Sequence, residues 1–131
     1  MFRVTKPEGA YRIELEDVPV PEIKSTEVLI RTERTLISRG SEIWRRYARE
    51  EAIDPAIMGY SLVGSIVQVG SEVEELSMGE RVAALAPHAE WVTVEVVRSG
   101  IKPSIVSLPG DISSEAGTFW PLGTSSVMWM D

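Results

Sequence analysis

The sequence predicts a mainly β fold, a small and partly open β-barrel with one short helix and helical segments at its C-terminal end. Roughly seven short runs rich in Val, Ile and aromatic residues are separated by Gly- and Pro-containing turns, a pattern typical of sandwiches and barrels. Residues 59–82 contain two β-rich runs, each opened by glycine, as expected for a sharply bent strand and its return partner. With 131 residues, the chain is long enough for one domain with one core.

The N-terminal part is predicted to form a hairpin, a connector and a long strand. Residues 2–4 and 11–16 alternate apolar and polar side chains around a Lys-Pro-Glu-Gly turn, so we expect them to pair. Two prolines at positions 19 and 21 predict an extended connector at the edge of the sheet. Residues 27–36 alternate cleanly and predict a long strand. Ser41 is then expected to cap a helix over residues 42–51 that ends before Pro55.

The C-terminal part is predicted to contain three more strands and then helix. The strands are expected at residues 82–85, 91–97 and 105–108, separated by turns that contain proline. After residue 109 the pattern becomes helical, with Ser113 or Ser114 as the cap. We therefore divide the chain into a barrel at residues 1–112 and a helical segment at residues 113–131.

The composition excludes several classes of protein. An apolar fraction of 44% and a charged fraction of 25% are typical of soluble globular chains. No apolar run approaches the ~20 residues of a membrane span, and the N-terminus lacks the apolar core of a signal peptide, so we expect a cytoplasmic protein with no membrane partner. Thirteen basic against twenty acidic residues give a net charge of -7, which argues against a nucleic acid partner. Without cysteine, disulfides and thiolate metal sites are excluded.

The last residues form a dense apolar cluster. Val127, Met128, Trp129 and Met130 lie in what is predicted to be the start of a helix, and no Gly or Pro stop signal follows. We interpret this helix as cut off. Because an exposed apolar patch tends to mark an interface, these four residues predict a homo-oligomer contact. The alternative is that they pack onto the core of the same domain.

Several motifs, in their order and spacing, resemble one known family. They are Val-Pro-Val-Pro at residues 18–21, Gly-Ser-Ile-Val-Gln-Val-Gly at 64–70, Gly-Glu-Arg-Val at 79–82, His-Ala-Glu-Trp-Val at 88–92 and Ser-Leu-Pro at 107–109. Together they resemble the N-terminal half of the medium-chain dehydrogenase/reductase (alcohol dehydrogenase-like) superfamily. The resemblance implies a GroES-like barrel on the substrate side of a cleft, a small-molecule substrate, and a nicotinamide cofactor carried by a Rossmann domain that follows.

The sequence itself contains no dinucleotide site. Such a site needs a glycine-rich turn between a strand and a helix, whereas Gly59, Gly64 and Gly70 have the wrong spacing and lie in or beside predicted strands. We therefore expect NAD or NADP only with a further domain, and none bound by this chain alone. We interpret the chain as a fragment or truncated form of a quinone reductase-like oxidoreductase, not active by itself.

The residues at the family's zinc positions do not favour zinc. Catalytic zinc takes about three protein ligands and an open position. The resemblance places the family's first cysteine at Ser38 or Ile37, its His-Glu pair at Tyr60 and Ser61, and a glutamate before Pro-Leu at Trp120. None of these side chains binds zinc well, so we expect no zinc and assign the chain to a zinc-lacking branch.

A zinc-free site would use hydrogen-bond donors to polarise a substrate carbonyl while the cofactor delivers hydride. Tyr60, Ser38 and Ser41 are the catalytic candidates. The structural alternatives are a core aromatic for Tyr60 and turn or cap residues for the serines. His88 has no second metal ligand near it in sequence, so we interpret it as a turn or strand-edge histidine.

Three further residues are candidates for binding. Arg39 would contact the cofactor pyrophosphate, or else be a solvated loop arginine. Trp44 and Trp120 would line the substrate pocket, or else pack in the core. A second hypothesis, from a different class, is a non-enzymatic GroES-like barrel that acts as a self-association or docking module.

Overall fold

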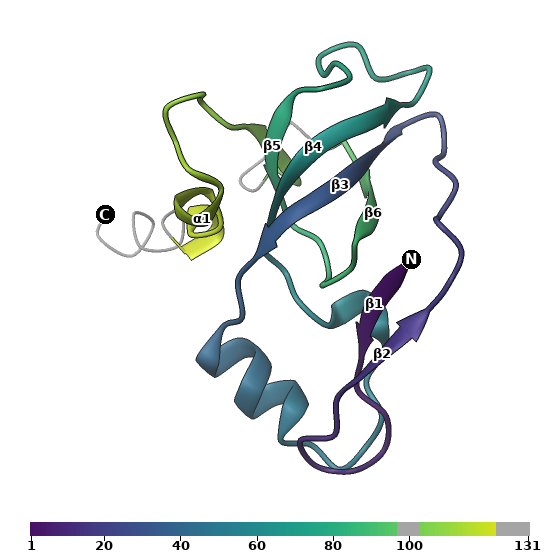
Figure 1. Cartoon of the computed structure of the whole chain (residues 1–131), viewed down its shortest axis with the longest axis vertical. Coiled ribbons are helices and arrows are strands. Elements are labelled where there is room, and N and C mark those ends of the chain that lie inside the picture. Colours follow the sequence, from purple (N-terminus) through teal and green to yellow (C-terminus); the bar gives the residue numbers. More distant parts are fainter. Residues whose placement is uncertain (97–102, 123–131) are drawn as a thin grey trace.

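The computed structural model describes residues 1–96 and 103–122. The elements follow the chain in this order (Figure 1): β1 (Phe2–Thr5), β2 (Glu14–Asp17), β3 (Glu27–Thr35), helix η1 (Arg39–Tyr47), the short helix η2 (Pro55–Ile57), β4 (Leu62–Val69), β5 (Arg81–Ala84), β6 (Trp91–Glu95), β7 (Ile105–Ser107) and α1 (Ser114–Gly117). The predicted mainly β fold is confirmed.

Five strands form one antiparallel sheet in the order β6-β3-β4-β5-β7. The glycine-framed stretch supplies β4 and β5, which pair from Leu62 with Ala84 to Ser65 with Arg81, as predicted. The sheet stays open, but its two edges approach each other, since the Ser104 hydroxyl donates to the Glu95 carbonyl at 2.6 Å. This arrangement agrees with the predicted partly open barrel.

The core lies on one face of this sheet. It collects apolar side chains from every strand of the sheet: Val28, Ile30, Leu62, Ile66, Val82, Ala84, Val92, Val94 and Ile105. Burying each of the larger ones contributes about 1.5–3 kcal/mol. Gly64 lets β3 and β4 pack closely, because a Cβ there would lie 2.2 Å from the carbonyl oxygen of Arg31.

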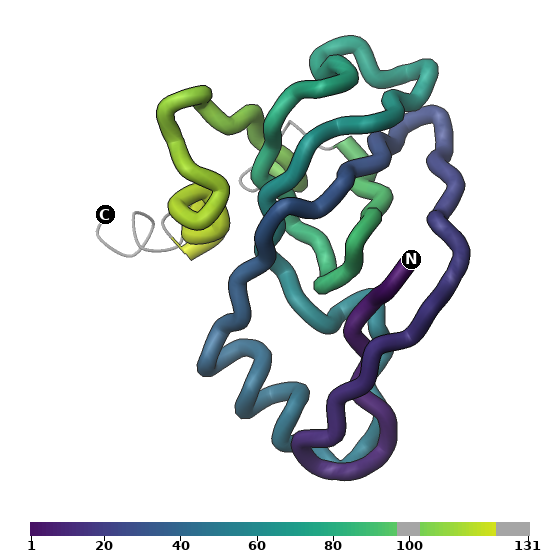
Figure 2. The backbone as a smooth tube through the Cα atoms, in the orientation of Figure 1, coloured from purple at the N-terminus to yellow at the C-terminus, as the bar shows by residue number. Residues whose placement is uncertain are grey.

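The predicted N-terminal hairpin is confirmed as the pair β1 and β2. Its second strand begins at Glu14 rather than at residue 11, because Tyr11 has a φ of 60° and turns the chain. The hairpin attaches to the rest through main-chain hydrogen bonds to residues 88–90. Figure 2 shows the chain leaving β2 and running along the side of the molecule to the start of β3.

Lys6 ties this hairpin to the segment after η1. Its side chain is only 1% exposed, and its ammonium donates to the carbonyl oxygens of Pro7, Gly9 and Glu51 at 2.9, 2.8 and 3.0 Å. The Lys6 carbonyl in turn accepts from the Ile53 N–H. The hairpin connection is therefore organised around one buried cation.

The first helix begins earlier than predicted. Ser38, not Ser41, is the cap: its hydroxyl accepts the Ser41 N–H at 3.3 Å. The helix is a π-helix in which the Ile43 N–H reaches back to the Ser38 carbonyl and the Ala48 N–H to the Ile43 carbonyl. The sequence rule for α-helix caps missed this start because Ser41 already lies inside the first wide turn.

The last described helix has the predicted cap. Ser113 accepts the Ala116 N–H, and α1 is joined to the sheet by a hydrogen bond from Ser61 to the Thr118 carbonyl. The apolar cluster of Val127, Met128, Trp129 and Met130 lies outside the described residues. In the part of the chain that is described, no helix has the length and hydropathy that crossing a membrane requires.

Candidate functional site

A buried carboxylate and the single histidine of the chain form the polar centre of the domain. Glu42, in η1, is 0% exposed, and His88, between β5 and β6, is 6% exposed. His88 Nε2 lies 2.6 Å from Glu42 Oε1. The other oxygen, Glu42 Oε2, accepts the Ser38 N–H at 2.6 Å, and the Tyr47 hydroxyl lies 3.5 Å from Oε1.

This pair lies where three segments of the site meet. The Leu36 N–H donates to the Ser61 carbonyl, and the His88 N–H donates to the Met58 carbonyl. Gly59 lies against the histidine ring, and a Cβ there would come within 2.8 Å of two ring atoms. The end of β3, the turn before β4 and the segment after β5 are therefore fixed to one another around Glu42 and His88.

The electrostatics keep Glu42 ionised. Burial is the largest influence and opposes ionisation, but the hydrogen bonds from His88 and from the Ser38 N–H, together with the charge of Arg46, lower the pKa of Glu42 below its ordinary value of 4.5. Burial, followed by the charge of Glu42, raises the pKa of Tyr47 to about 12, so its hydroxyl stays protonated. The cluster therefore carries one carboxylate with three donors around it.

The structure brings some of the predicted site residues to this centre. Ser38 and Ser41 form the capped start of η1, which is their structural alternative, and Ser38 contacts Glu42 directly. Tyr60 is half-buried and follows Gly59, whose φ of 112° turns the chain next to His88. Within residues 1–96 and 103–122, the Tyr60 hydroxyl has no hydrogen-bond partner.

The predicted binding residues are less buried than the Glu42–His88 pair. Arg39 is exposed at the first position of η1, and Trp44, on the same helix, is 64% exposed, so it is not a core residue. Trp120 is half-buried beyond α1.

The pairing of Glu42 with His88 cannot be seen in the sequence. His88 lies in a bend before β6, in line with a turn or strand-edge residue, but its ring is buried and paired with Glu42. The two residues are 46 positions apart, and no periodicity links them. Glu42 and Tyr47 are the two buried residues of η1, and nothing in the sequence distinguishes Glu42 from the exposed acids, since acidic side chains are rarely fully buried unless paired.

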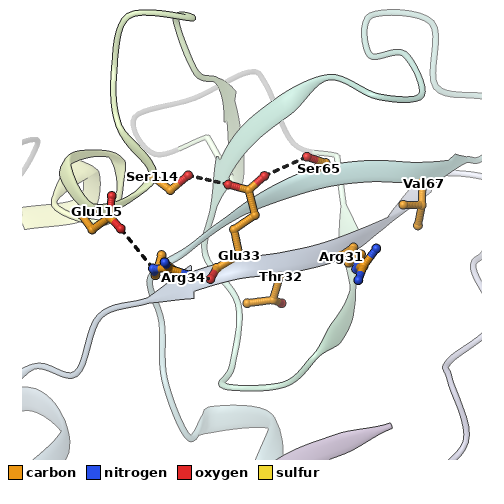
Figure 3. Close-up of a pocket in the computed structure, with 8 residues that line it drawn as sticks. All are labelled: Arg31, Thr32, Glu33, Arg34, Ser65, Val67, Ser114 and Glu115. Atoms are coloured by element: carbon orange, nitrogen blue, oxygen red, sulfur yellow. Dashed lines mark hydrogen bonds and ion pairs between the residues drawn. The ribbon is translucent and has the colours of Figure 1, made fainter.

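A separate pocket lies on the outer face of the sheet (Figure 3). It has a volume of about 540 Å³ and is formed by β3, β4 and the start of α1. Its lining is polar and contains none of the residues predicted as a site: Arg31, Thr32, Glu33, Arg34, Ser65, Val67, Ser114 and Glu115. Glu33 accepts from Ser114 and from Ser65, and Arg34 pairs with Glu115 at 3.1 Å. These contacts fasten α1 to the sheet.

We expect Glu33→Gln to weaken this attachment slightly and in a pH-dependent way. The hydrogen bond from Ser114 is the main cause that lowers the pKa of Glu33 below 4.5 in the folded chain. Its stabilising contribution is therefore complete above about pH 4.5 and is lost as the pH falls through the lower folded value. Because Glu33 is exposed, the loss at pH 7 should be under about 1 kcal/mol.

Urea unfolding at pH 7 and pH 3 measures this effect. The difference between Glu33→Gln and the unmodified chain should shrink toward zero at pH 3. Glu74→Gln, at an exposed position outside the pocket, serves as the control. A difference that grows at low pH would contradict the prediction.

Comparison with known proteins gives the family. Residues 24–119 match the family described as the alcohol dehydrogenase GroES-like domain. The chain belongs to this family. This GroES-like domain is the N-terminal domain of medium-chain dehydrogenase/reductase oxidoreductases, as the sequence motifs predict.

The curated relatives of this GroES-like domain are much longer. The L-threonine 3-dehydrogenase of Legionella pneumophila (strain Corby) is 40% identical over 73 residues, which are 53% of this chain and 21% of that protein. The L-threonine 3-dehydrogenase of Bacillus subtilis (strain 168) is 33% identical over 88 residues, 64% of this chain and 25% of that protein. The chain thus spans about a fifth to a quarter of the length of these relatives.

Solved structures with the same fold include a human and a bacterial protein. The human synaptic vesicle membrane protein VAT-1 homolog-like protein matches with a TM-score of 0.75 at 22% identity. The match covers 98% of this chain and 42% of the human chain. The galactitol-1-phosphate dehydrogenase of Escherichia coli matches with a TM-score of 0.73 at 21% identity. That match covers 91% of this chain and 41% of the dehydrogenase. At these identities the likeness establishes the fold of the GroES-like domain alone.

Proposed function

We propose that this chain is the substrate-side domain of a zinc-independent, NAD(P)-dependent oxidoreductase, with the cofactor held by a region outside these 131 residues. The observation that carries the proposal is the Glu42–His88 pair, which uses the one histidine of the chain as a hydrogen-bond partner. The resemblance of the motifs implies that the zinc-ligand positions of the superfamily are taken here by Ser38 or Ile37, by Tyr60 with Ser61, and by Trp120. This donor set does not fit catalytic zinc, which needs about three N, S or carboxylate ligands. Within the described residues, no group of three or more His, Cys, Asp or Glu side chains comes together.

Hydrogen-bond donors would take over the polarising role. The Tyr60 hydroxyl, without a partner among the described residues, is available to donate to a substrate oxygen, and Ser38 and Ser41 are the further candidate donors. A donor aimed at developing negative charge contributes about 10²–10³ in rate in other enzymes. NAD(P)H would supply the hydride when bound. Arg39 is exposed at the start of η1, where its planar guanidinium can meet a phosphate.

The proposal names a class of substrate rather than one compound. The relatives are named for L-threonine, galactitol-1-phosphate and quinones. Only oxidation of an alcohol or reduction of a carbonyl or quinone is therefore proposed for this chain. The alternative, a docking module, depends on the apolar cluster outside the described residues, and no contact in the described part favours it.

Metal content is the first test. Elemental analysis of the purified chain after dialysis against zinc should find well under one zinc per chain, and NADPH fluorescence should show no binding at millimolar cofactor. Stoichiometric zinc would contradict zinc independence. Tight NADPH binding would contradict the assignment of the cofactor to another region.

The enzymatic role is tested in a chimera. This chain would replace the equivalent domain of the Escherichia coli quinone oxidoreductase, whose solved structure contains NADPH. Binding of NADPH shows that the chimera is folded. Quinone reduction should then be insensitive to EDTA, and Tyr60→Phe should lower kcat about 10²-fold, with Tyr11→Phe as the control. A folded chimera whose kcat is unchanged by Tyr60→Phe would remove Tyr60 from the proposed site.

A further inference from the structure

The Glu42–His88 pair holds together segments that are far apart in the sequence. Glu42 Oε2 receives the main-chain N–H of Ser38, and Oε1 receives His88. The His88 ring lies on Gly59, directly before Tyr60. Two hydrogen bonds of 2.6 Å and one close ring contact thus connect the helix cap, the histidine and the turn that carries Tyr60.

We propose that Glu42 and His88 form a metal-free tie that positions Tyr60 relative to Ser38 on the substrate side of the domain. This proposal rests on the proposed function only in assigning Tyr60 a role toward the substrate. The tie itself is a property of the described residues. Glu42 and His88 act through Ser38 and Tyr60, so they are positioning residues rather than catalytic ones.

The geometry defines the state of the histidine. Since Glu42 is an acceptor, Nε2 must carry a proton and donate it. Nδ1 is buried and has no partner among the described residues. Orphaned buried N–H groups are rarer in proteins than under-satisfied acceptors, which favours a lone pair at this position. The geometry therefore points to a proton on Nε2 that is donated to the Glu42 carboxylate.

The contact between the His88 ring and Gly59 links the position of His88 to that of Tyr60, the next residue in the chain. A side chain at residue 59 would strike Nε2 and Cδ2 of His88 at 2.8 Å, so the glycine leaves space for the ring. The turn at Gly59 has a φ of 112° and leads directly into Tyr60. If the ring is removed, the turn loses the surface on which it lies, and Tyr60 changes its surroundings.

Imidazole nitrogen NMR tests the first part on the unmodified 131-residue chain. Because the chain has one histidine, its two nitrogen signals need no assignment by mutation. At pH 7 we expect a protonated, pyrrole-type Nε2 and an unprotonated, pyridine-type Nδ1. Addition of zinc should leave both signals unchanged. A proton on Nδ1 would overturn the proposal.

Fluorine NMR tests the positioning. The chain has three tyrosines, so fluorotyrosine labelling gives one signal for Tyr60, one for Tyr47 in the cluster and one for the remote Tyr11. In His88→Leu the Tyr60 signal should move by more than its line width while Tyr11 stays in place. His88→Gln keeps an N–H donor and should restore the Tyr60 signal most of the way. A Tyr60 signal unaffected by His88→Leu would overturn the tie.

A second variant, Glu42→Gln, tests the tie if His88→Leu does not fold. Glu42→Gln keeps the volume but has one acceptor oxygen where Glu42 has two, so it cannot accept from both the Ser38 N–H and His88 Nε2, and it should shift the Tyr60 signal in the same direction by a smaller amount. No shift in a folded Glu42→Gln would overturn the tie. Stoichiometric zinc with unchanged histidine signals would contradict the proposed function and leave the tie intact. An unmoved Tyr60 signal would remove the tie and leave zinc independence standing.

Discussion

Lys6→Met should lower the free energy of unfolding by roughly 3–5 kcal/mol, because three carbonyl oxygens lose their donor and each unsatisfied buried acceptor costs about 1–3 kcal/mol. The Lys6 ammonium is 1% exposed and donates to three carbonyl oxygens, those of Pro7, Gly9 and Glu51. Methionine fills the stem of the lysine but donates nothing. The three carbonyls then lose a charged donor, and each such bond contributes about 1.5–3 kcal/mol. Urea unfolding followed by tryptophan fluorescence measures the change.

Two variants separate the role of Lys6 from the loss of a positive charge. Lys24→Met removes an exposed lysine and should change stability by no more than about 0.5 kcal/mol. Lys6→Arg keeps the charge, but its planar fork does not direct hydrogens at three carbonyls as an ammonium does, so it should also destabilise the chain. A Lys6→Met variant as stable as Lys24→Met would show that the carbonyl cage contributes little.

The strands were predictable because their signals are local. Residues 27–36 alternate with period two, and β3 follows them almost to the residue. The glycines of residues 59–82 marked a bent strand and its return, and β4 pairs with β5 there. Where prediction failed, the cause was a local exception. A φ of 60° at Tyr11 delays β2, and the wide turns of η1 move its start back to Arg39.

The polar centre could not be predicted in the same way. Glu42 and His88 meet only because β3 and the segment after β5 are brought together by the sheet and by the bonds at Met58 and Ser61. The family resemblance directed attention to Ser38 and Tyr60, and both lie near this centre. It gave no reason to pair Glu42 with His88, since His88 by itself has the sequence signature of a turn or strand-edge histidine. Lys6 was likewise seen only as part of a turn, because its carbonyl partner at Glu51 is 45 positions away.

Gly59→Ala is expected to cost roughly 2–6 kcal/mol, for two reasons that act together. The residue has a φ of 112°, a conformation in which an L side chain is strained by about 1–3 kcal/mol. Its new Cβ would also lie 2.8 Å from Nε2 and Cδ2 of His88, and overpacking of this kind costs about 1–3 kcal/mol. Urea unfolding gives the sum of the two effects.

The variant Gly79→Ala separates the backbone strain from the overpacking. Gly79 also has a positive φ, 85°, but a Cβ there meets nothing within 4 Å, so only the backbone strain remains. The difference between the two variants, about 1–3 kcal/mol, is the cost of pushing the His88 ring out of its place. If Gly59→Ala and Gly79→Ala cost the same, the ring moves aside freely and His88 is not held by Glu42. If the Gly59 variant costs more, the contact that excludes a methyl group also holds the His88 ring against the turn that leads into Tyr60.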